Sequence, residues 1–222
     1  MAKLNDLMRW PMVYSNVPKW LVAGIALLLL HACSIPVRTA AKAPKGDATA
    51  TAAIKVDQKA QQQFDEALKA MQAGQDKQAE ALLLSLTQSF PNFSGPYVNL
   101  GIINFRANRP KEAESFFAKA LAINQRNKVA HNYMGVAHRN AGRFDDARKA
   151  YEAALAIDQN YASAHLNLGI LLDLYLQDST QALEHYEKYQ QLTAPPDKQV
   201  SNWIADLKQR APKPATSSGV KQ

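Results

Sequence analysis

Hydrophobic and small residues in the central part of the chain recur with a fixed period. Between Ser94 and Tyr161 the same 34-residue pattern of apolar and polar positions occurs twice, with no insertion. The matching pairs are Gly101 and Gly135, Ala113 and Ala147, Ala120 and Ala154, Leu121 and Leu155, Ile123 and Ile157, and Phe117 and Tyr151. A fixed period of this length is typical of architectures in which one supersecondary unit stacks on the next. The pattern therefore predicts a repeat protein, for which binding is the leading function.

Three positions of the unit predict how its helices pack. Position 8 is small, position 20 is alanine and position 24 is bulky; the residues are Ala67, Gly101, Gly135 and Gly169, then Ala79, Ala113, Ala147 and, one residue late, Ala182, then Leu83, Phe117, Tyr151 and Tyr186. We expect the small residues to let two helix backbones approach closely, and the bulky residues to fill the space between neighbouring hairpins.

Position 15 predicts where the first helix of each unit turns. It is occupied by Gly74, Asn108 and Gly142, residue types that tolerate a left-handed backbone at a helix end. Pro110 follows shortly after Asn108 and is expected to be the first residue of the next helix.

This register resembles the tetratricopeptide repeat family, whose 34-residue unit reads W-x2-L-G-x2-Y, then A-x3-F, then P. The resemblance runs from about Ala60 to Pro195 and implies an all-α solenoid of helix-turn-helix units. The sequence departs from the family pattern at position 4, usually Trp, and at position 32, usually Pro. Position 4 holds Gln63, Tyr97, His131 and His165, and position 32 holds Pro91, Gln125 and Gln159. The first unit also has Glu66 and Ala67 where Leu and Gly are expected.

The repeat domain is predicted over residues 60–196, in four units of 60–93, 94–127, 128–161 and 162–195. The fourth unit has one extra residue, which we place in the turn from Tyr175 to Thr180. After two prolines, Asp197 is expected to cap a final helix over 197–210, whose apolar stripe covers the end of the stack. That stripe consists of Val200, Trp203, Ile204 and Leu207. The tail over 211–222 is rich in Pro and Ser and is expected to be disordered.

Residues 1–32 have the pattern of a secretory signal peptide. Basic residues at positions 3, 9 and 19 precede an uninterrupted apolar run from Trp20 to Leu30. This run is shorter than the roughly 20 residues that a membrane-spanning helix needs, and it suits a signal-peptide core of about 7 to 15 residues. The alternative is an uncleaved anchor helix, and Met8 or Met12 is an alternative start to Met1.

The apolar run ends in Leu30-His31-Ala32-Cys33, which resembles the lipobox of bacterial lipoproteins. The resemblance implies that Cys33 becomes the lipidated first residue of the mature protein. Cys33 is the only cysteine, so it has no partner for an intrachain disulfide. By the same resemblance, Ser34 favours the periplasmic face of the outer membrane, with an inner-membrane anchor as the alternative. Residues 33–59, rich in Ala, Thr, Pro and Lys, are expected to form a flexible linker.

Composition and motifs indicate a non-enzymatic protein. The formal charge of +7 is spread along the repeats and the tail rather than clustered, so no nucleic-acid partner is predicted. None of the common nucleophile, zinc-protease or nucleotide-binding motifs is present, so we expect no catalysis and no cofactor beyond the lipid on Cys33. His131 and His138 are two helical turns apart, about 10.5 Å, which is too far for one metal ion. We therefore expect no metal site.

In the family, positions 2, 5, 9 and 12 of the first helices line a concave groove that binds peptides or helices. The corresponding residues are Phe64, Leu68, Met71, Val98, Ile102, Phe105, Asn132, Val136, Arg139, Leu166, Ile170 and Asp173. An exposed apolar strip usually marks a partner surface, and the polar groups of Asn132 and Arg139 suit the backbone of an extended peptide. The alternative is that Phe64, Ile102 and Phe105 are used by packing between repeats.

Chaperone-binding members of the family hold two carboxylates with Lys, Asn and Arg in this groove. Here Phe64 and Leu68 occupy two of those positions, and only Asn99 matches. An acidic C-terminal tail is therefore not the expected ligand.

Taken together, these features predict a lipid-anchored periplasmic scaffold that recruits or positions other envelope proteins. Its layout is similar to that of repeat lipoproteins that assist pilus secretins and of those that dock peptidoglycan hydrolases. Two alternatives remain open. One is a self-associating structural component of an envelope machine, and the other is an adaptor or regulatory subunit for a cell-wall enzyme.

Overall fold

The computed structural model describes residues 58–210. The predicted signal peptide, the lipidation site at Cys33 and the tail over 211–222 lie outside the described residues, as does nearly all of the linker. The linker was predicted to extend to Lys59, but its last two residues, Gln58 and Lys59, belong to the first described helix. Both are good helix formers in an exposed first turn, so extending the helix over them buries no polar group.

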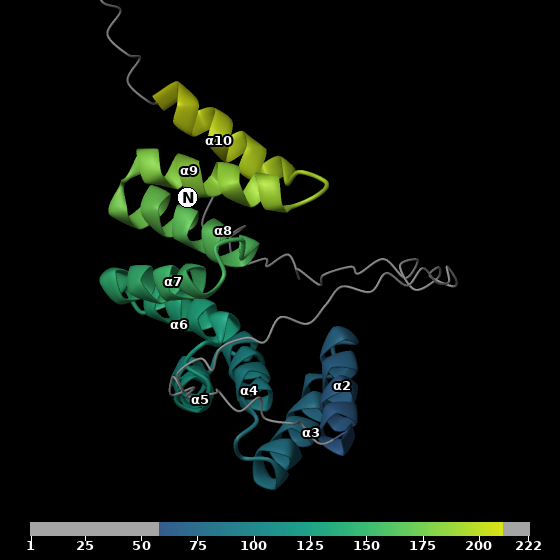
Figure 1. The fold of residues 1–222 in the computed structure, drawn as a ribbon. Helices are drawn as coiled ribbons and strands as arrows, with labels where there is room; N and C mark the ends of the chain where they lie inside the picture. Colours follow the sequence, from purple (N-terminus) through teal and green to yellow (C-terminus); the bar gives the residue numbers. More distant parts are fainter. Residues whose placement is uncertain (1–57, 211–222) are drawn as a thin grey trace, which may run out of the picture. The chain divides into compact units, whose positions relative to one another are not determined.

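Four helical hairpins and a final helix follow one another along the chain (Figure 1). They are α2 (Gln58–Gln72) with α3 (Asp76–Ser89), α4 (Ser94–Arg106) with α5 (Pro110–Ile123), α6 (Lys128–Asn140) with α7 (Phe144–Ile157), α8 (Ala162–Leu171) and the short π-helix η1 (Leu172–Leu176) with α9 (Ser179–Leu192), and then α10 (Lys198–Arg210). All regular structure within 58–210 is helical, which confirms the predicted all-α helix-turn-helix solenoid.

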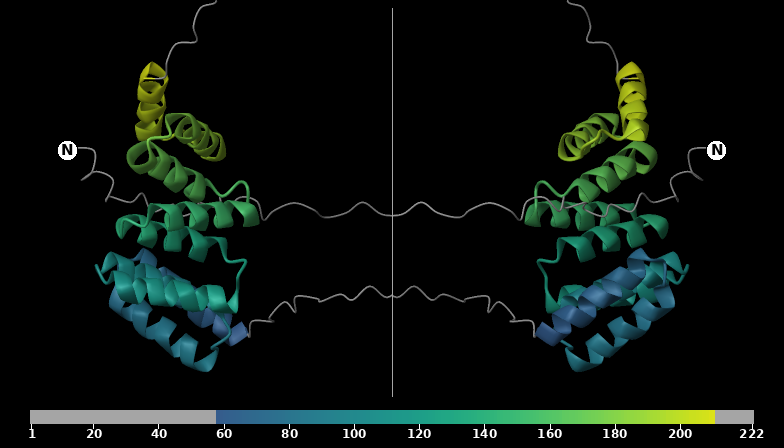
Figure 2. Two further views of the ribbon diagram at one scale, coloured as in Figure 1. Left: turned by 90° about the vertical axis from the view of Figure 1, so that its left-hand side faces the viewer. Right: turned by 90° about the vertical axis from the view of Figure 1, so that its right-hand side faces the viewer.

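The hairpins are stacked so that first helices lie beside first helices. The two helices of each hairpin contact one another, and each second helix also contacts the first helix of the next hairpin. In addition, α6 touches both α4 and α8, so these three first helices lie side by side along the stack (Figure 2). Among the described helices, none is both long and apolar enough to cross a membrane.

The first three hairpins turn at the residues that the sequence predicts. Gly74, Asn108 and Gly142 have left-handed backbones, with φ of 71°, 58° and 74°. The amide of the following residue then donates to a carbonyl five residues earlier, which satisfies the helix end. These bonds join Gln75 to Ala70, Arg109 to Asn104, and Arg143 to His138, each at 2.9 Å. Pro110 begins α5, as expected.

The extra residue of the fourth unit lies in the first helix and not in the turn after it, so the predicted position was wrong. The helix widens into η1, and the amide of Asp178 closes it by donating to the carbonyl of Leu172 at 2.9 Å. Gln177 then takes the left-handed conformation with φ 57°. Because the insertion follows Gly169, the packing of that glycine against Tyr186 is retained.

The small residue at position 8 makes room for an aromatic ring. It was predicted to let two helix backbones approach closely, and that prediction is corrected here. A Cβ atom built on Gly135 would lie 2.5 Å from Cε1 of Tyr151, and one on Gly169 would lie 2.7 Å from Cδ1 of Tyr186. Gly101 faces Phe117 in the same way. The bulky residue at position 24 therefore packs inside its own hairpin as well as against neighbours.

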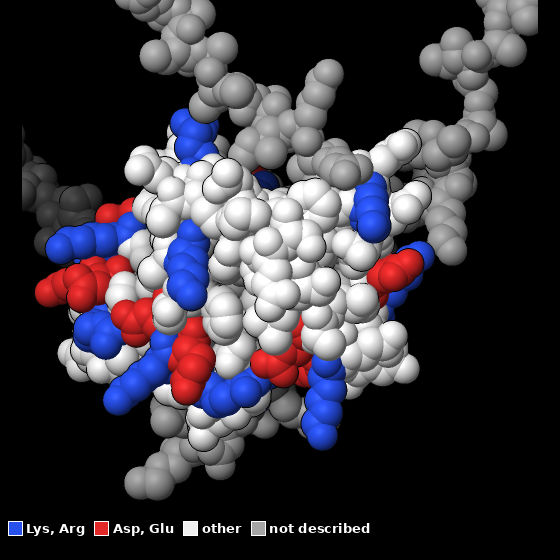
Figure 3. All heavy atoms as spheres, turned by 90° about the horizontal axis from the view of Figure 1, so that it is seen from below, with Lys and Arg blue, Asp and Glu red and all other residues white. Residues whose placement is uncertain are grey.

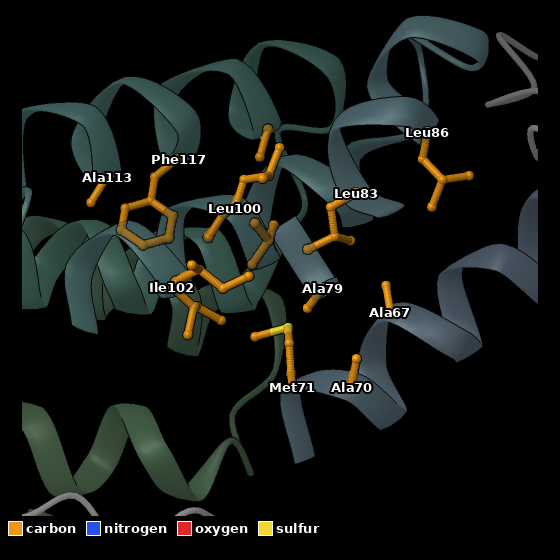
Figure 4. Close-up of a cluster of buried hydrophobic side chains, with 14 of the residues drawn as sticks. Ala67, Ala70, Met71, Ala79, Leu83, Leu86, Leu100, Ile102, Ala113 and Phe117 are labelled. Atoms are coloured by element: carbon orange, nitrogen blue, oxygen red, sulfur yellow. The ribbon is translucent and has the colours of Figure 1, made fainter. Parts of the chain in front are cut away.

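The first hairpin uses a smaller pair at the same two positions. Ala67 and Leu83 replace the glycine and the ring, and both are fully buried. Figure 4 shows Leu83 and Phe117 on their second helices, with their side chains in the buried cluster of the first two hairpins. In the first hairpin, the larger residue at position 8 (Ala67 instead of Gly) is thus matched by a smaller residue at position 24 (Leu83 instead of an aromatic ring).

Helix α10 occupies the place of the first helix of a fifth unit. Its Trp203 ring lies 5.4 Å from the ring of Tyr186, much as the ring of Tyr133 in the third unit lies 5.6 Å from that of Phe117 in the second unit. Val200 and Leu207 are each 1% exposed. The carboxylate of Asp197 accepts from the amide of Val200 at 3.2 Å and so caps the helix.

Candidate partner-binding face

The row of first helices presents the residues that were predicted to bind a partner, and these residues fall into two groups. Six are buried, with exposed fractions of at most 8%: Met71, Val98, Ile102, Asn132, Val136 and Ile170. Six are half-buried: Phe64, Leu68, Phe105, Arg139, Leu166 and Asp173. We call these half-buried residues the first-helix face. The buried group stabilises the stack, so any contact with a partner falls mainly to the first-helix face.

Phe64 is partly used by packing between the first two units, which was the alternative interpretation of this residue. Its ring centroid lies 4.9 Å from that of Phe93. A Cβ atom on Gly95, at position 2 of the next unit, would lie 2.9 Å from Cζ of Phe64. The glycine therefore leaves space for this ring.

Asn132 is engaged inside the protein. Its side-chain oxygen accepts a hydrogen bond from Nδ2 of Asn167 at 3.0 Å, and the two residues are 2% and 3% exposed. The bond joins α6 to α8 and satisfies two buried amides, which are costly to leave unpaired. Sequence reasoning missed Asn167, which lies at position 6 rather than at a predicted groove position.

Arg139 and Tyr151 carry buried donors without an acceptor. Nε and Nη1 of Arg139 and the hydroxyl of Tyr151 have no hydrogen-bond partner in the described part of the protein. Burial raises the pKa of Tyr151 to about 12, while the neighbouring charge of Arg139 acts in the opposite direction. The phenol is therefore neutral at physiological pH and able to donate a hydrogen bond.

Asp173, the acidic member of the first-helix face, is held by neighbouring side chains. Its carboxylate accepts from Nη2 of Arg210 at 3.3 Å and from the hydroxyl of Tyr186 at 3.5 Å, and its side chain is 8% exposed. Burial, and then the charge of Asp173, raises the pKa of Tyr186. Asp173 thus links the fourth hairpin to α10.

The histidines at position 4 explain the two departures from the family pattern. Nε2 of His131 donates to the carbonyl of Gln125 at 2.9 Å, and Nε2 of His165 donates to that of Gln159 at 3.0 Å. The replacement of Trp at position 4 thus accompanies the replacement of Pro at the preceding position 32. Both side chains have structural contacts, and the described residues contain no cluster of His, Cys, Asp or Glu suited to a metal ion.

A second histidine, the half-buried His185, pairs with His165 in the fourth hairpin. Nδ1 of His165 lies 2.9 Å from Nδ1 of His185. Because Nε2 of His165 carries the proton that binds a carbonyl, its Nδ1 is the acceptor and His185 is the donor. Burial, together with the neighbouring His165, lowers the pKa of His185 to about 4.

Exposed ion pairs repeat between successive hairpins. Arg109 reaches Glu80 at 3.2 Å and Arg143 reaches Glu114 at 2.7 Å, in the same register of consecutive units. Exposed pairs of this kind stabilise a protein by about 0 to 1 kcal/mol each. Figure 3 shows side chains of both signs intermingled on one face, beside a broad area without charged side chains.

Comparison with known proteins assigns the repeats. A model described as tetratricopeptide repeat matches residues 56–128, and one described as TPR repeat matches 137–173. The fold is similar to that of pilF from Pseudomonas aeruginosa, with 26% identity, a TM-score of 0.62, and coverage of 68% of this chain and 69% of that one.

Two other solved structures share the fold. TTC0263 from Thermus thermophilus has 21% identity and a TM-score of 0.58, and covers 68% of this chain and 82% of its own. MamA from Desulfovibrio magneticus RS-1 has 19% identity and a TM-score of 0.57, and covers 70% and 86%. No protein of curated function matches the sequence.

Proposed function

Because the chain carries tetratricopeptide repeats, which serve as scaffolds for protein–protein interaction, we propose that it is a non-enzymatic scaffold that binds and positions other envelope proteins. The observation that carries the proposal is the composition of the first-helix face. Phe105 on α4, Arg139 on α6 and Leu166 on α8 are all half-buried, and α6 contacts both α4 and α8. Arg is one of the residue types that most often contribute binding energy at protein interfaces, and neighbouring apolar contacts exclude water from it.

We propose that a lipid on Cys33 anchors the scaffold at the periplasmic face of the outer membrane. The support is the apolar run from Trp20 to Leu30, the lipobox-like sequence that ends at Cys33, and Ser34 after it. Several acyl chains, each buried methylene contributing about 0.8 kcal/mol, anchor a protein stably.

Labelling with palmitate tests this anchor. Wild-type protein is expected to incorporate the label and to sediment with outer membranes, whereas Cys33→Ser is expected to do neither. Label-free wild-type protein would contradict the lipid anchor. Label found only in inner-membrane fractions would support the alternative location.

The envelope machine that the scaffold serves is proposed to be a pilus or secretin assembly. This rests on the similarity of the overall layout, a lipidated cysteine followed by repeats, to lipoproteins that assist pilus secretins. The solved fold of pilF from Pseudomonas aeruginosa, 26% identical, offers a template for comparing the two first-helix faces residue by residue. The alternative is an adaptor for a cell-wall enzyme.

Photocrosslinking in cells tests the binding face. A photoreactive residue at Phe105 or Leu166 is expected to capture a partner, whereas one at the exposed residues Lys119 or Glu152 of the second helices is not. Capture at the second helices alone would contradict the proposal. Crosslinks from Phe105 or Leu166 to a second copy of the chain would support the self-associating alternative.

A further inference from the structure

The fourth hairpin turns through an apolar segment, whereas the first three turn through small and polar residues. The three earlier turn segments are 72–75, 106–109 and 140–143, in which every side chain is polar or no larger than that of alanine. In the fourth unit, η1 places Leu174, Tyr175 and Leu176 at this edge of the stack. Tyr175 is exposed and both leucines are half-buried. The insertion in the fourth unit therefore exposes apolar side chains at an otherwise polar edge.

Tyr175 forms an exposed aromatic pair with Phe144, the first residue of α7. Their ring centroids lie 4.8 Å apart. Tyr175 is 38% exposed and Phe144 is half-buried, so the pair is open to solvent. Within 58–210 the only other large apolar side chain of similar exposure is Leu84, at 41%. An exposed tyrosine ring is a favourable contact surface, and π-helical insertions often lie at functional sites.

The C-terminal segment of the chain, residues 211–222, begins beside η1. Arg210 is the last residue of α10, and its Nη2 donates to the carboxylate of Asp173 at 3.3 Å. Asp173 and Tyr175 belong to the same five-residue helix η1. A polyproline-type chain advances about 3.1 Å per residue, so twelve residues span up to about 37 Å. The C-terminal segment is therefore long enough to reach the aromatic pair from the end of α10.

The sequence of the C-terminal segment suits an aromatic surface. The segment begins Ala211-Pro212-Lys213-Pro214, and prolines in alternate positions favour the extended polyproline conformation. Proline-rich segments bind surfaces lined by aromatic side chains, and little entropy is lost because the proline backbone is already constrained. The adjacent rings of Phe144 and Tyr175 provide a surface of this kind.

The charges on the two sides are complementary. The C-terminal segment contains Lys213 and Lys221 and no acidic residue. Asp145 and Asp146 follow Phe144 in the first turn of α7, and both are exposed. Opposite charges therefore attract the C-terminal segment to the side of the stack that carries the aromatic pair.

We propose that residues 211–214 bind in cis to the aromatic pair, with a proline ring on the face of Tyr175 and Lys213 beside Asp145 and Asp146. The contact covers the apolar side chains that the insertion exposes, and it joins the end of α10 to α7. This inference does not depend on the proposed function. A partner that uses the turn edge of the fourth hairpin has to displace the C-terminal segment first.

NMR of the purified full-length chain tests this contact. The ring resonances of Tyr175, assigned by their loss in Tyr175→Leu, are compared between the wild type and the double variant Pro212→Ala with Pro214→Ala. We expect the double variant to shift these resonances to their values in a chain that ends at Arg210, because both changes uncover the ring. The methyl resonances of Leu84, the other exposed large apolar side chain, are the control and are expected to stay unchanged.

A second pair of substitutions tests the charges. Asp145→Asn with Asp146→Asn is expected to lower the ratio of bound to free C-terminal segment about two- to fivefold, as for the loss of exposed ion pairs. The ratio is read from the position of the Tyr175 resonances between their bound and free values. The matched control, Asp65→Asn with Glu66→Gln, removes two exposed carboxylates from α2 and is expected to leave the ratio unchanged. Circular dichroism checks that each variant is folded.

The inference fails if the Tyr175 resonances are the same in the wild type and in the chain that ends at Arg210. It also fails if these resonances move with protein concentration, which would indicate that a second copy covers the ring. A response to the truncation without a response to the two proline substitutions would overturn the proline contact. An equal effect of the Asp65 and Glu66 control would overturn the role of the α7 carboxylates.

Discussion

Replacing Gly135 by alanine is expected to destabilise the protein, although alanine is the better helix former. The added Cβ would lie 2.5 Å from Cε1, 2.7 Å from Cδ1 and 3.0 Å from Cζ of Tyr151. Those distances are well inside van der Waals contact, and Tyr151 is 0% exposed, so its ring has no free space to enter. The ring or helix α6 must therefore move.

Two opposing terms set the size of the effect. Overpacking a filled core costs about 1 to 3 kcal/mol. The helix propensity of alanine over glycine returns up to about 1 kcal/mol. We therefore expect Gly135→Ala to lower the free energy of unfolding by about 1 to 2 kcal/mol, measured by urea denaturation followed by circular dichroism.

A second substitution is expected to rescue the first. The pair Gly135→Ala with Tyr151→Leu copies the native pair Ala67 and Leu83 of the first hairpin. Tyr151→Leu alone leaves a cavity, which the methyl group added by Gly135→Ala partly fills in the double variant. The double variant should therefore be more stable than the sum of the single effects predicts, by about 0.5 to 3 kcal/mol.

Gly74→Ala serves as the control, because nothing lies within 4 Å of a Cβ there and its cost comes from the left-handed backbone with φ 71°. That cost should be unaffected by Tyr151→Leu. A Gly135→Ala variant as stable as wild type, or an absence of coupling with Tyr151→Leu, would refute the steric explanation of position 8.

Three further perturbations test other contacts. Lowering the pH from 7 toward 4 is expected to destabilise the fold, because His185 has a pKa of about 4 when folded and gains a proton on unfolding near its ordinary value of 6.5. The contribution of His185 to the free energy of unfolding is complete above pH 6.5. It is at most about 3 kcal/mol, and nearer 1 to 2 kcal/mol because the ring is partly exposed. The difference between the urea midpoints at pH 7 and pH 4.5 should therefore be smaller in His185→Gln than in the wild type. Asn167→Leu, which leaves the buried oxygen of Asn132 unpaired, should cost about 1 to 3 kcal/mol, and adding Asn132→Leu should recover part of the loss in thermal unfolding. Asp178→Ala removes the side-chain cap of α9 and should cost about 1 kcal/mol in urea unfolding, whereas a similar loss in Asp178→Asn would contradict the capping role.

The repeat period predicted the hairpins and their turns because both depend on local chemistry. Gly74, Asn108 and Gly142 are residue types that accept a left-handed backbone, so their spacing alone located three turns. The period did not locate the insertion of the fourth unit, because an extra residue anywhere between Gly169 and Ala182 gives the same spacing. Gly169 must keep its contact with the ring of Tyr186, and the structure meets this requirement by placing the extra residue in the widened helix η1.

The sequence predicted the binding face less completely than the fold. The same apolar stripe of a first helix serves contacts within the stack and contacts with a partner, so Val136 and Phe105 look alike in sequence although Val136 is fully buried and Phe105 is not. The sequence alone therefore could not separate the buried residues of this stripe from those that remain partly exposed.

Helix α10 has a further consequence for assembly. Its apolar residues Val200 and Leu207 face the stack, while Lys198, Asn202 and Gln209 are exposed to solvent. This polar, solvated side of α10 lacks the apolar surface on which another hairpin could pack, so we expect no further repeat to stack on α10. If copies of this protein join one another, they must do so through the opposite end or side to side, which limits any polymer to geometries that leave this helix facing water.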